Sequence, residues 1–354
     1  MSAGVLAFHL NRLRYLWKGR RALPRYLRTY CRYRFRPDLI TLRSLSILLG
    51  YACSCRCAFC SVEQLKGTSS AALGVEEITD LVDQGLALGV VNVTLSGGEP
   101  LLYMDKLAPV IRHVRSRGAL ATVATTGLGL AEHLPELAAA GLRNVFISLG
   151  GIGQVHDASR HVDGLFEQAM AGLRQARAMG LFVGVRGIAT EENIADGSLE
   201  RLITYLGEQD LLLTCTPIYS GRVETEEGRV RVLSPQGQAR LREMQARYPN
   251  FMLDVYANLN YPACPAMHEW ITILSDGEAV PCAGIMVSVG NVREHSLRDL
   301  LAKARSIPDF GSVTPLCKSG EDEAFCRRWI EPIHDSALPV RVEDHPYGRT
   351  LGRK

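Results

Sequence analysis

The sequence contains no uninterrupted apolar run of about 18 residues, so no helix that crosses a membrane is expected. It also has no export signal, because no basic stretch precedes the apolar residues between Met1 and Trp17. Internal repeats and low-complexity tracts are absent, which excludes a repeat protein. Ten cysteines among 354 residues are far too few for a small disulfide scaffold. These absences together indicate a reduced protein of the cytoplasm.

Charge is distributed unevenly along the chain. Residues 1–43 contain eleven lysines and arginines and a single acid, so this arm carries +10, whereas the rest of the chain carries −7. The arginines of residues 25–36 recur at helical spacing: Arg25, Arg28, Arg32 and Arg36. Such a basic amphipathic arm can lie on an anionic membrane surface or bind an acidic carrier. The alternative is a solvated helix pair packed on the outer surface of the protein.

From residue 45 onward, apolar β-rich segments alternate with segments of helical periodicity. We expect six buried parallel strands, at residues 45–51, 91–97, 120–127, 144–150, 181–189 and 211–218. Helices are expected between them, near residues 75–89, 105–117, 132–140, 164–179 and 198–208. The alternation predicts an α/β fold, a partial (β/α)6 TIM-like barrel whose ligands lie at the carboxyl ends of the strands.

The alternation stops at residues 220–231, which predicts a domain boundary. Three parts are therefore expected: the basic arm (residues 1–44), the partial barrel (45–222), and a small α+β domain with cysteines that includes the C-terminal tail (235–354). The length of 354 residues is sufficient for one large domain and a smaller one.

Four cysteines lie close together in YACSCRCAFC, residues 51–60, directly after the first expected strand. A disulfide is disfavoured, because a reducing compartment opposes it and thiols this close in sequence have poor geometry. Zinc would need a fourth ligand at compatible spacing, and the nearest histidines are far away in sequence. Cys53, Cys57 and Cys60 have the wider spacing, and three thiolates can bind three irons of a 4Fe–4S cluster and leave the fourth iron open.

CxxxCxxC with an aromatic residue before the last cysteine resembles the cluster motif of the radical S-adenosylmethionine (SAM) superfamily. A second segment, LSGGEPLL at residues 95–102, resembles the GGEP motif of that family and also ends an expected strand. The resemblance implies that Cys53, Cys57 and Cys60 bind a 4Fe–4S cluster with an open iron site. It also implies a set of SAM-binding residues: Phe59 near the adenine, Gly97, Gly98, Glu99 and Pro100 at the methionyl end, Ser148 at the ribose or carboxylate, and Arg186 at the carboxylate.

Two positions depart from the family pattern. The acid that usually stands two residues after Ser148 is Gly150 here, and Cys55 is an additional thiol that we do not expect to bind the cluster. His156, in the segment VHDASR, is expected to be structural.

The family chemistry implies reductive cleavage of SAM to a 5′-deoxyadenosyl radical that abstracts hydrogen from the substrate. The sequence assigns no catalytic residue of its own.

A second set of cysteines follows the barrel. Cys264 and Cys282 occur in the spacing C-x12-G-x4-C, followed by Gly-Asn at residues 290–291, and the intervening segment is expected to form a hairpin that turns at Asp276-Gly277. This pattern resembles the auxiliary-cluster region called SPASM, or its shorter form, twitch. The resemblance implies that Cys264, Cys282, Cys317 and Cys326 bind a second 4Fe–4S cluster. A zinc site or a fold without a cluster is the alternative.

The predicted function is therefore that of a radical SAM oxidoreductase of a biosynthetic pathway, with the second cluster accepting an electron. The first alternative is an epimerase or isomerase of the same architecture, with a free Cys317 or Cys326 as hydrogen donor. A zinc-binding protein that binds nucleic acid is the alternative of another class, but it leaves the GGEP segment unexplained. Expected partners are a reductant such as flavodoxin or ferredoxin and a small-molecule, lipid or peptide substrate; nucleic acid is not expected.

Overall fold

The computed structural model describes residues 22–36, 39–57, 59–66, 71–217, 232–254 and 263–351. A sheet of nine strands runs through these residues in the order β7-β6-β5-β4-β3-β2-β1-β8-β9, and all neighbours are parallel except β8 and β9. The strands are β1 (Ser44–Leu48), β2 (Asn92–Ser96), β3 (Leu120–Thr125), β4 (Asn144–Ser148), β5 (Phe182–Ala189), β6 (Leu213–Pro217), β7 (Phe251–Leu253), β8 (Trp270–Ile273) and β9 (Ala279–Val280).

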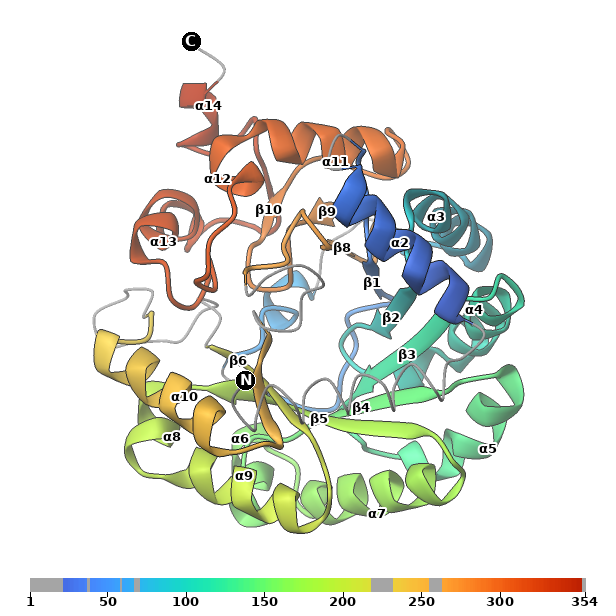
Figure 1. Ribbon diagram of the computed structural model, residues 1–354, viewed down its shortest axis with the longest axis vertical. Coiled ribbons are helices and arrows are strands. Elements are labelled where there is room, and N and C mark those ends of the chain that lie inside the picture. Colours follow the sequence, from blue (N-terminus) through green and yellow to red (C-terminus); the bar gives the residue numbers. More distant parts are fainter. Residues whose placement is uncertain are drawn as a thin grey trace.

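Helices cover the outer side of the curved sheet (Figure 1). Those of the alternating part are α3 (Val75–Leu88), α4 (Met104–Ser116), α5 (Leu130–Ala140), α6 (Gln154–Arg160), α7 (Leu165–Ala178), α8 (Glu191–Ala195), α9 (Ser198–Glu208) and α10 (Pro235–Arg247). The C-terminal part contains α11 (Leu297–Ser306), α12 (Pro308–Gly311), α13 (Glu323–Trp329), α14 (Gly348–Leu351) and the paired short strands β10 (Val287–Ser288) and β11 (Val340–Arg341). No helix of the described residues is both long and apolar enough to cross a membrane.

Side chains alternate between two environments along the strands. In β1, Leu45 and Ile47 are buried in the main hydrophobic core, whereas Ser44 and Ser46 line an internal cavity. The same alternation places Val93 and Leu95 of β2 in the core, and the other three side chains of that strand line the cavity. Successive residues of a strand point to opposite faces, so the aliphatic side chains pack against the helices. The hydroxyl groups therefore face the inside of the barrel.

The predicted fold class is confirmed, and the six predicted strands and five predicted helices are all present. The ends of α9 are as predicted, and the other elements are shifted at one or both ends. The hairpin is confirmed as well, because β8 and β9 pair antiparallel and Gly277 turns with φ +93°. Two strands extend the predicted sheet: β7 pairs with β6, and β8 pairs with the other edge of β1. The predicted boundary at residues 220–231 lies outside the described residues, and the division into three parts stays a prediction.

The helix of the basic arm is α2 (Leu23–Phe35). It lies across the C-terminal ends of α3 and α4, which is the end of the barrel where the strands begin (Figure 1). On its inner side, Tyr26 packs against Val91 and Leu120. Arg25, Thr29 and Arg32 also point inward, and each donates a hydrogen bond to a backbone carbonyl. The first part of the arm, residues 1–21, lies outside the described residues.

Candidate active site

The loop after β1, which carries the first cysteine set, is bound to the loop after β2. The backbone amides of Gly98 and Glu99 donate to the carbonyls of Gly50 and Ala52, over 2.9 and 2.8 Å. A Cβ atom on Gly97 would lie 2.5 Å from the Gly50 oxygen, and one on Gly98 would lie 2.2 Å from the Ala52 oxygen. Only glycine permits these approaches, so the two glycines of the GGEP segment fix one loop against the other.

The four thiols of the first cysteine set line one cavity, which has a volume of about 460 Å³: Cys53, Cys55, Cys57 and Cys60. The Cys55 thiol lies between Cys53 and Cys57, and hydrogen bonding to it lowers the pKa of Cys53 to about 7 and the pKa of Cys57 to about 6. The same hydrogen bonds raise the pKa of Cys55, and burial raises the pKa of Cys60. Cys53 and Cys57 are thus the most readily ionised thiols of the set, and the thiolate is the form that binds metals.

Arg160, the last residue of α6, lies next to the first cysteine set. Its Nη1 donates a hydrogen bond to the Cys57 sulfur over 3.2 Å, and its guanidinium carbon lies 5.0 Å from the centre of the Phe59 ring. The charge of Arg160 adds to the lowering of the pKa of Cys57. Arg160 is not among the residues predicted from the sequence. Its only signal there is its position at the end of the VHDASR segment, after the fourth strand.

Glu99 of the GGEP segment is buried and joins the ends of β2 and β3. Its carboxylate accepts hydrogen bonds from the Thr125 hydroxyl over 2.7 Å and from the Thr126 hydroxyl over 2.6 Å. It also accepts hydrogen bonds from the backbone amides of Thr126 and Leu101. Gly97 and Gly98 line the cavity, whereas Glu99 and Pro100 do not. The structure therefore gives Glu99 a role in holding the loops together, and the SAM-binding assignment of these four residues stays a prediction.

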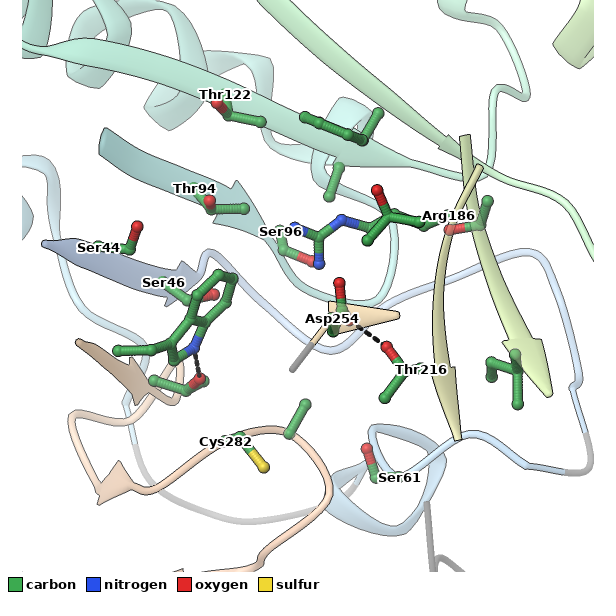
Figure 2. A pocket seen from close by; sticks show the side chains of 18 of the residues that line it. Ser44, Ser46, Ser61, Thr94, Ser96, Thr122, Arg186, Thr216, Asp254 and Cys282 are labelled. Atoms are coloured by element: carbon green, nitrogen blue, oxygen red, sulfur yellow. Dashed lines mark hydrogen bonds between the residues drawn. The ribbon is translucent and has the colours of Figure 1, made fainter. Parts of the chain in front are cut away.

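The inside of the barrel is polar and contains one guanidinium held between aromatic rings. Arg186 enters the cavity from β5, and its guanidinium carbon lies 5.1 Å from the Phe146 ring and 5.7 Å from the Trp270 ring (Figure 2). Its Nε has no hydrogen-bond partner within the part of the chain that the structure describes. Ser148 and Asp254 line the same cavity, and Asp254 accepts a hydrogen bond from Thr216. Ser148 and Arg186 thus lie where a ligand of the cavity could contact them.

The second cysteine set meets the first at this cavity. Cys264, Cys282 and Cys317 line it, whereas Cys326 is buried behind it, with its sulfur 3.4 Å from the Lys318 carbonyl oxygen. Burial raises the pKa of Cys282 to about 12 and also raises that of Cys317. A neutral thiol in such surroundings ionises only with a compensating charge, which a bound metal supplies.

The hairpin between Cys264 and Cys282 explains why glycine and asparagine occur at fixed places in this motif. A Cβ atom on Gly277 would lie 2.6 Å from the side-chain oxygen of Asn291, so the two residues pack directly together. The Asn291 amide nitrogen donates to the Asp276 carbonyl over 3.1 Å and to a Glu278 carboxylate oxygen over 3.2 Å. Asn291 therefore holds the turn that presents Cys282.

Both cysteine sets fit iron–sulfur clusters by the chemistry of their donors. All ten cysteines are free thiols, and seven of them line the shared cavity. Among the described residues, no three His, Cys, Asp or Glu side chains are close enough together to hold a single metal ion. The cysteines of a 4Fe–4S cluster bind separate irons, so they lie further apart than the ligands of one ion. The individual ligand assignments within each set stay predictions.

Two family models match the chain. The model described as radical SAM superfamily matches residues 47–204, and the SPASM model, described as an iron–sulfur cluster-binding domain, matches residues 264–328. The PqqA peptide cyclase of Streptomyces rochei is 29% identical over an alignment of 278 positions, and the match covers 73% of this chain and 73% of that protein. The GTP 3′,8-cyclase of Rhodopseudomonas palustris is 31% identical over 59% of this chain, and the match spans 61% of the cyclase.

A solved structure with a similar fold is that of native anSMEcpe with bound AdoMet and Kp18Cys peptide. The TM-score is 0.59, the sequences are 16% identical, and the match covers 87% of this chain and 94% of that chain. At this level of identity the similarity shows the fold alone. It agrees with the parallel sheet described above.

Proposed function

Because the chain belongs to the radical SAM superfamily and carries a C-terminal SPASM-type iron–sulfur domain, we propose that it is an oxidoreductase that removes hydrogen from an organic substrate. The cofactors of this family are a 4Fe–4S cluster and SAM, and the SPASM-type domain implies a further iron–sulfur cluster. When bound, the first cluster and SAM supply a 5′-deoxyadenosyl radical that abstracts hydrogen from carbon.

The observation that carries the proposal is the single cavity shared by the two cysteine sets. Cys53, Cys57 and Cys60 would hold the first cluster at the carboxyl end of β1, and Cys264, Cys282 and Cys317 line the same cavity from the C-terminal part, with Cys326 behind them. A substrate in this cavity can lose a hydrogen atom on the side of the first set. It can then lose an electron towards the second set and a proton to a neighbouring base, which completes an oxidation.

The residues of this chain bind SAM and the substrate, and they exclude water from the cavity. We assign Gly97, Gly98, Ser148 and Phe59 to SAM, because all four line the cavity beside the first cysteine set. Arg186 is assigned to a carboxylate, since its guanidinium group lies in the cavity and its Nε has no hydrogen-bond partner within the described residues. Helices and aliphatic side chains close the outside of the barrel, so that a reactive radical inside meets few competing groups.

The experiment that tests the proposal compares single cysteine variants of the reconstituted protein under anaerobic conditions. Cys57→Ala should abolish the formation of 5′-deoxyadenosine from SAM. Cys282→Ala should retain it and lower the yield of oxidised product at least about tenfold, because the electron acceptor is lost. Cys215→Ala, which changes a buried thiol outside the cavity, is the matched control. Formation of 5′-deoxyadenosine by Cys57→Ala would contradict the assignment of the first set.

A second candidate is epimerisation, which is favoured by the position of Cys317 at the cavity wall. A thiol there could return a hydrogen atom to the substrate from the side opposite the first set. The product mass distinguishes the two reactions, because oxidation lowers the mass by about two units and epimerisation leaves it unchanged. In heavy water, epimerisation would also introduce deuterium at carbon.

For partners, we propose a polar small molecule, lipid or peptide as substrate and a flavodoxin or ferredoxin as reductant. The cavity volume of about 460 Å³ is in the range of small-ligand sites. Only one reacting group of a larger substrate would therefore enter it together with SAM. A peptide is supported by the similar fold of anSMEcpe, whose structure contains a bound peptide. Free thiols and reducible clusters are typical of proteins in a reducing compartment, so we propose the cytoplasm.

A further inference from the structure

Apart from Tyr26, which packs against Val91 and Leu120, the inner face of α2 is polar, and its polar side chains cap other helices. Arg25 and Arg32 donate to the carbonyls of Leu86 and Ala87, over 3.1 and 3.2 Å, and the buried Thr29 hydroxyl donates to the Gly89 carbonyl over 2.6 Å. These carbonyls lie at the C-terminal end of α3, where a helix leaves acceptors without partners and carries partial negative charge. The inward polar residues of α2 are thus explained by the hydrogen bonds that they donate to the barrel.

The outer face of α2 is apolar, which the fold itself does not explain. Leu23, Leu27 and Tyr30 are 40%, 53% and 40% exposed and follow one another at the spacing of one helix face, and Phe35 at the end of the helix is 69% exposed. Five of the nine large apolar side chains that are exposed among the described residues lie within residues 23–39. This concentration marks a surface that is covered by something apolar.

The charges around the apolar face of α2 indicate what kind of partner covers this face. Arg28 is exposed beside the apolar stripe, Arg34 is exposed one turn after Tyr30 on the same face, and the arm of residues 1–43 carries +10. Residues 1–21 contain five lysines and arginines and no acid, so packing them on α2 would bring like charges together. An acidic protein would neutralise the charge but would not require a row of exposed leucine and aromatic side chains. A bilayer with anionic lipids satisfies both features, because it offers phosphate groups at the depth of the arginines and acyl chains below them.

We propose that α2 is a membrane-contacting helix that lies flat on an anionic lipid surface. Its apolar stripe, defined by Leu23, Leu27 and Tyr30, enters the boundary between headgroups and acyl chains, and Arg28 and Arg34 contact lipid phosphates. Because α2 crosses the end of the barrel where the strands begin, this end faces the lipid. The cysteine loop follows the carboxyl end of β1, at the opposite end of the strands from α2, and therefore faces away from the membrane.

The test measures binding of the full-length holoprotein to vesicles by co-sedimentation. Vesicles of phosphatidylcholine with about a third phosphatidylglycerol are compared with vesicles of phosphatidylcholine alone, at low and high salt. The protein should bind the anionic vesicles, and salt should weaken the binding. Leu27→Glu should lower the partition coefficient at least about tenfold, or about 1.4 kcal/mol. Val155→Glu, a change at a 55% exposed apolar residue of α6, which follows the carboxyl end of β4 at the opposite end of the barrel, should leave it unchanged.

Cys31 provides a second readout on the same face, because it is exposed on α2 and lies next to Tyr30. A water-soluble maleimide should label Cys31 rapidly in buffer and slowly with anionic vesicles, as resolved by peptide mapping. Equal binding of Leu27→Glu and Val155→Glu, or binding that does not depend on the anionic lipid, overturns the proposal. So does slow labelling of Cys31 without vesicles, which would mean that another part of the chain covers the face. A dimer that Leu27→Glu converts to monomer would assign the face to a second copy.

Discussion

At the scale of single residues, Arg160 is the side chain that links the first cysteine set to the barrel. It is 8% exposed, and its guanidinium group reaches a sulfur that lies 103 residues earlier in the chain. A hydrogen bond and a positive charge beside a thiolate stabilise negative charge on sulfur. The same two effects stabilise the reduced, more negative state of a bound iron–sulfur cluster, because hydrogen bonds to the sulfurs set its potential.

Replacement of Arg160 by Met is therefore expected to change the cysteines in two measurable ways. In the cluster-free protein, the pKa of Cys57 should rise from about 6, because charge and hydrogen bond are both lost. This pKa is measured from the rate of Cys57 alkylation at a series of pH values, with the labelled cysteine identified by peptide mapping. In the reconstituted protein, the midpoint potential of the first cluster should fall in an EPR-monitored titration. Arg56→Met, at an exposed arginine of the same loop, is the control, and equal values for both variants would contradict the prediction.

His156 makes stability depend on pH. It is fully buried, its Nδ1 accepts a hydrogen bond from the Gly150 amide over 3.0 Å, and burial, aided by the charge of Arg160, lowers its pKa to about 4. The unfolded chain takes up the proton near pH 6.5, whereas the folded protein takes it up only near pH 4. Stability is therefore unaffected above pH 6.5 and is lost as the pH falls from 6.5 to 4, by up to about 3 kcal/mol.

Urea unfolding of the wild type and of His156→Gln at several pH values tests this. Glutamine can accept the same hydrogen bond but does not titrate. The difference in free energy of unfolding between the two proteins should stay constant above pH 6.5 and shift in favour of the variant towards pH 4. A difference that is independent of pH would mean that His156 is protonated in the folded state as readily as in the unfolded chain.

At the scale of elements, the pairing of β8 with β1 joins the C-terminal part to the barrel. Leu45 is in register with Ile271 and Ile47 with Ile273, and all four side chains are buried in the same hydrophobic core. Without β8, one edge of β1 would present unpaired backbone groups. The C-terminal part therefore contributes a strand to the sheet as well as cysteines to the cavity.

Native-state hydrogen exchange should show β1 and β8 as parts of one cooperative unit. The amide hydrogens of Ile271 and Ile273 should exchange with the same free energy of opening as those of Ser46 and Leu48, because the strands share one ladder and one core. Strand β3, in the middle of the sheet, serves as the reference for global unfolding. Exchange of β8 at a clearly lower free energy than β1 would show that the C-terminal part unfolds as an independent domain.

At the scale of the whole molecule, the sequence allowed the local parts of the fold and of the candidate site to be predicted. The six strands, the turn at Gly277 and the positions of the cysteine sets depend on patterns of a few residues, which are visible without the structure. Arg160, the inward arginines of α2 and the β1–β8 pairing were not predicted. Each depends on a contact across many residues: Thr29 and Gly89, for example, are 60 positions apart. Such long-range contacts cannot be predicted from the periodicity or spacing of residues in the sequence.

The pairing of β1 with β8 also affects how the chain is made. Strand β1 ends at residue 48, and its partner begins at residue 270, more than 220 positions later. At about 5–20 residues per second, a ribosome needs roughly 10 to 45 seconds to reach the missing strand. During that time the nascent polypeptide displays an open edge and thiols that are not yet enclosed. Chaperones that shield this edge, and a supply of iron and sulfide that follows completion of translation, would therefore govern how much intact enzyme a cell obtains.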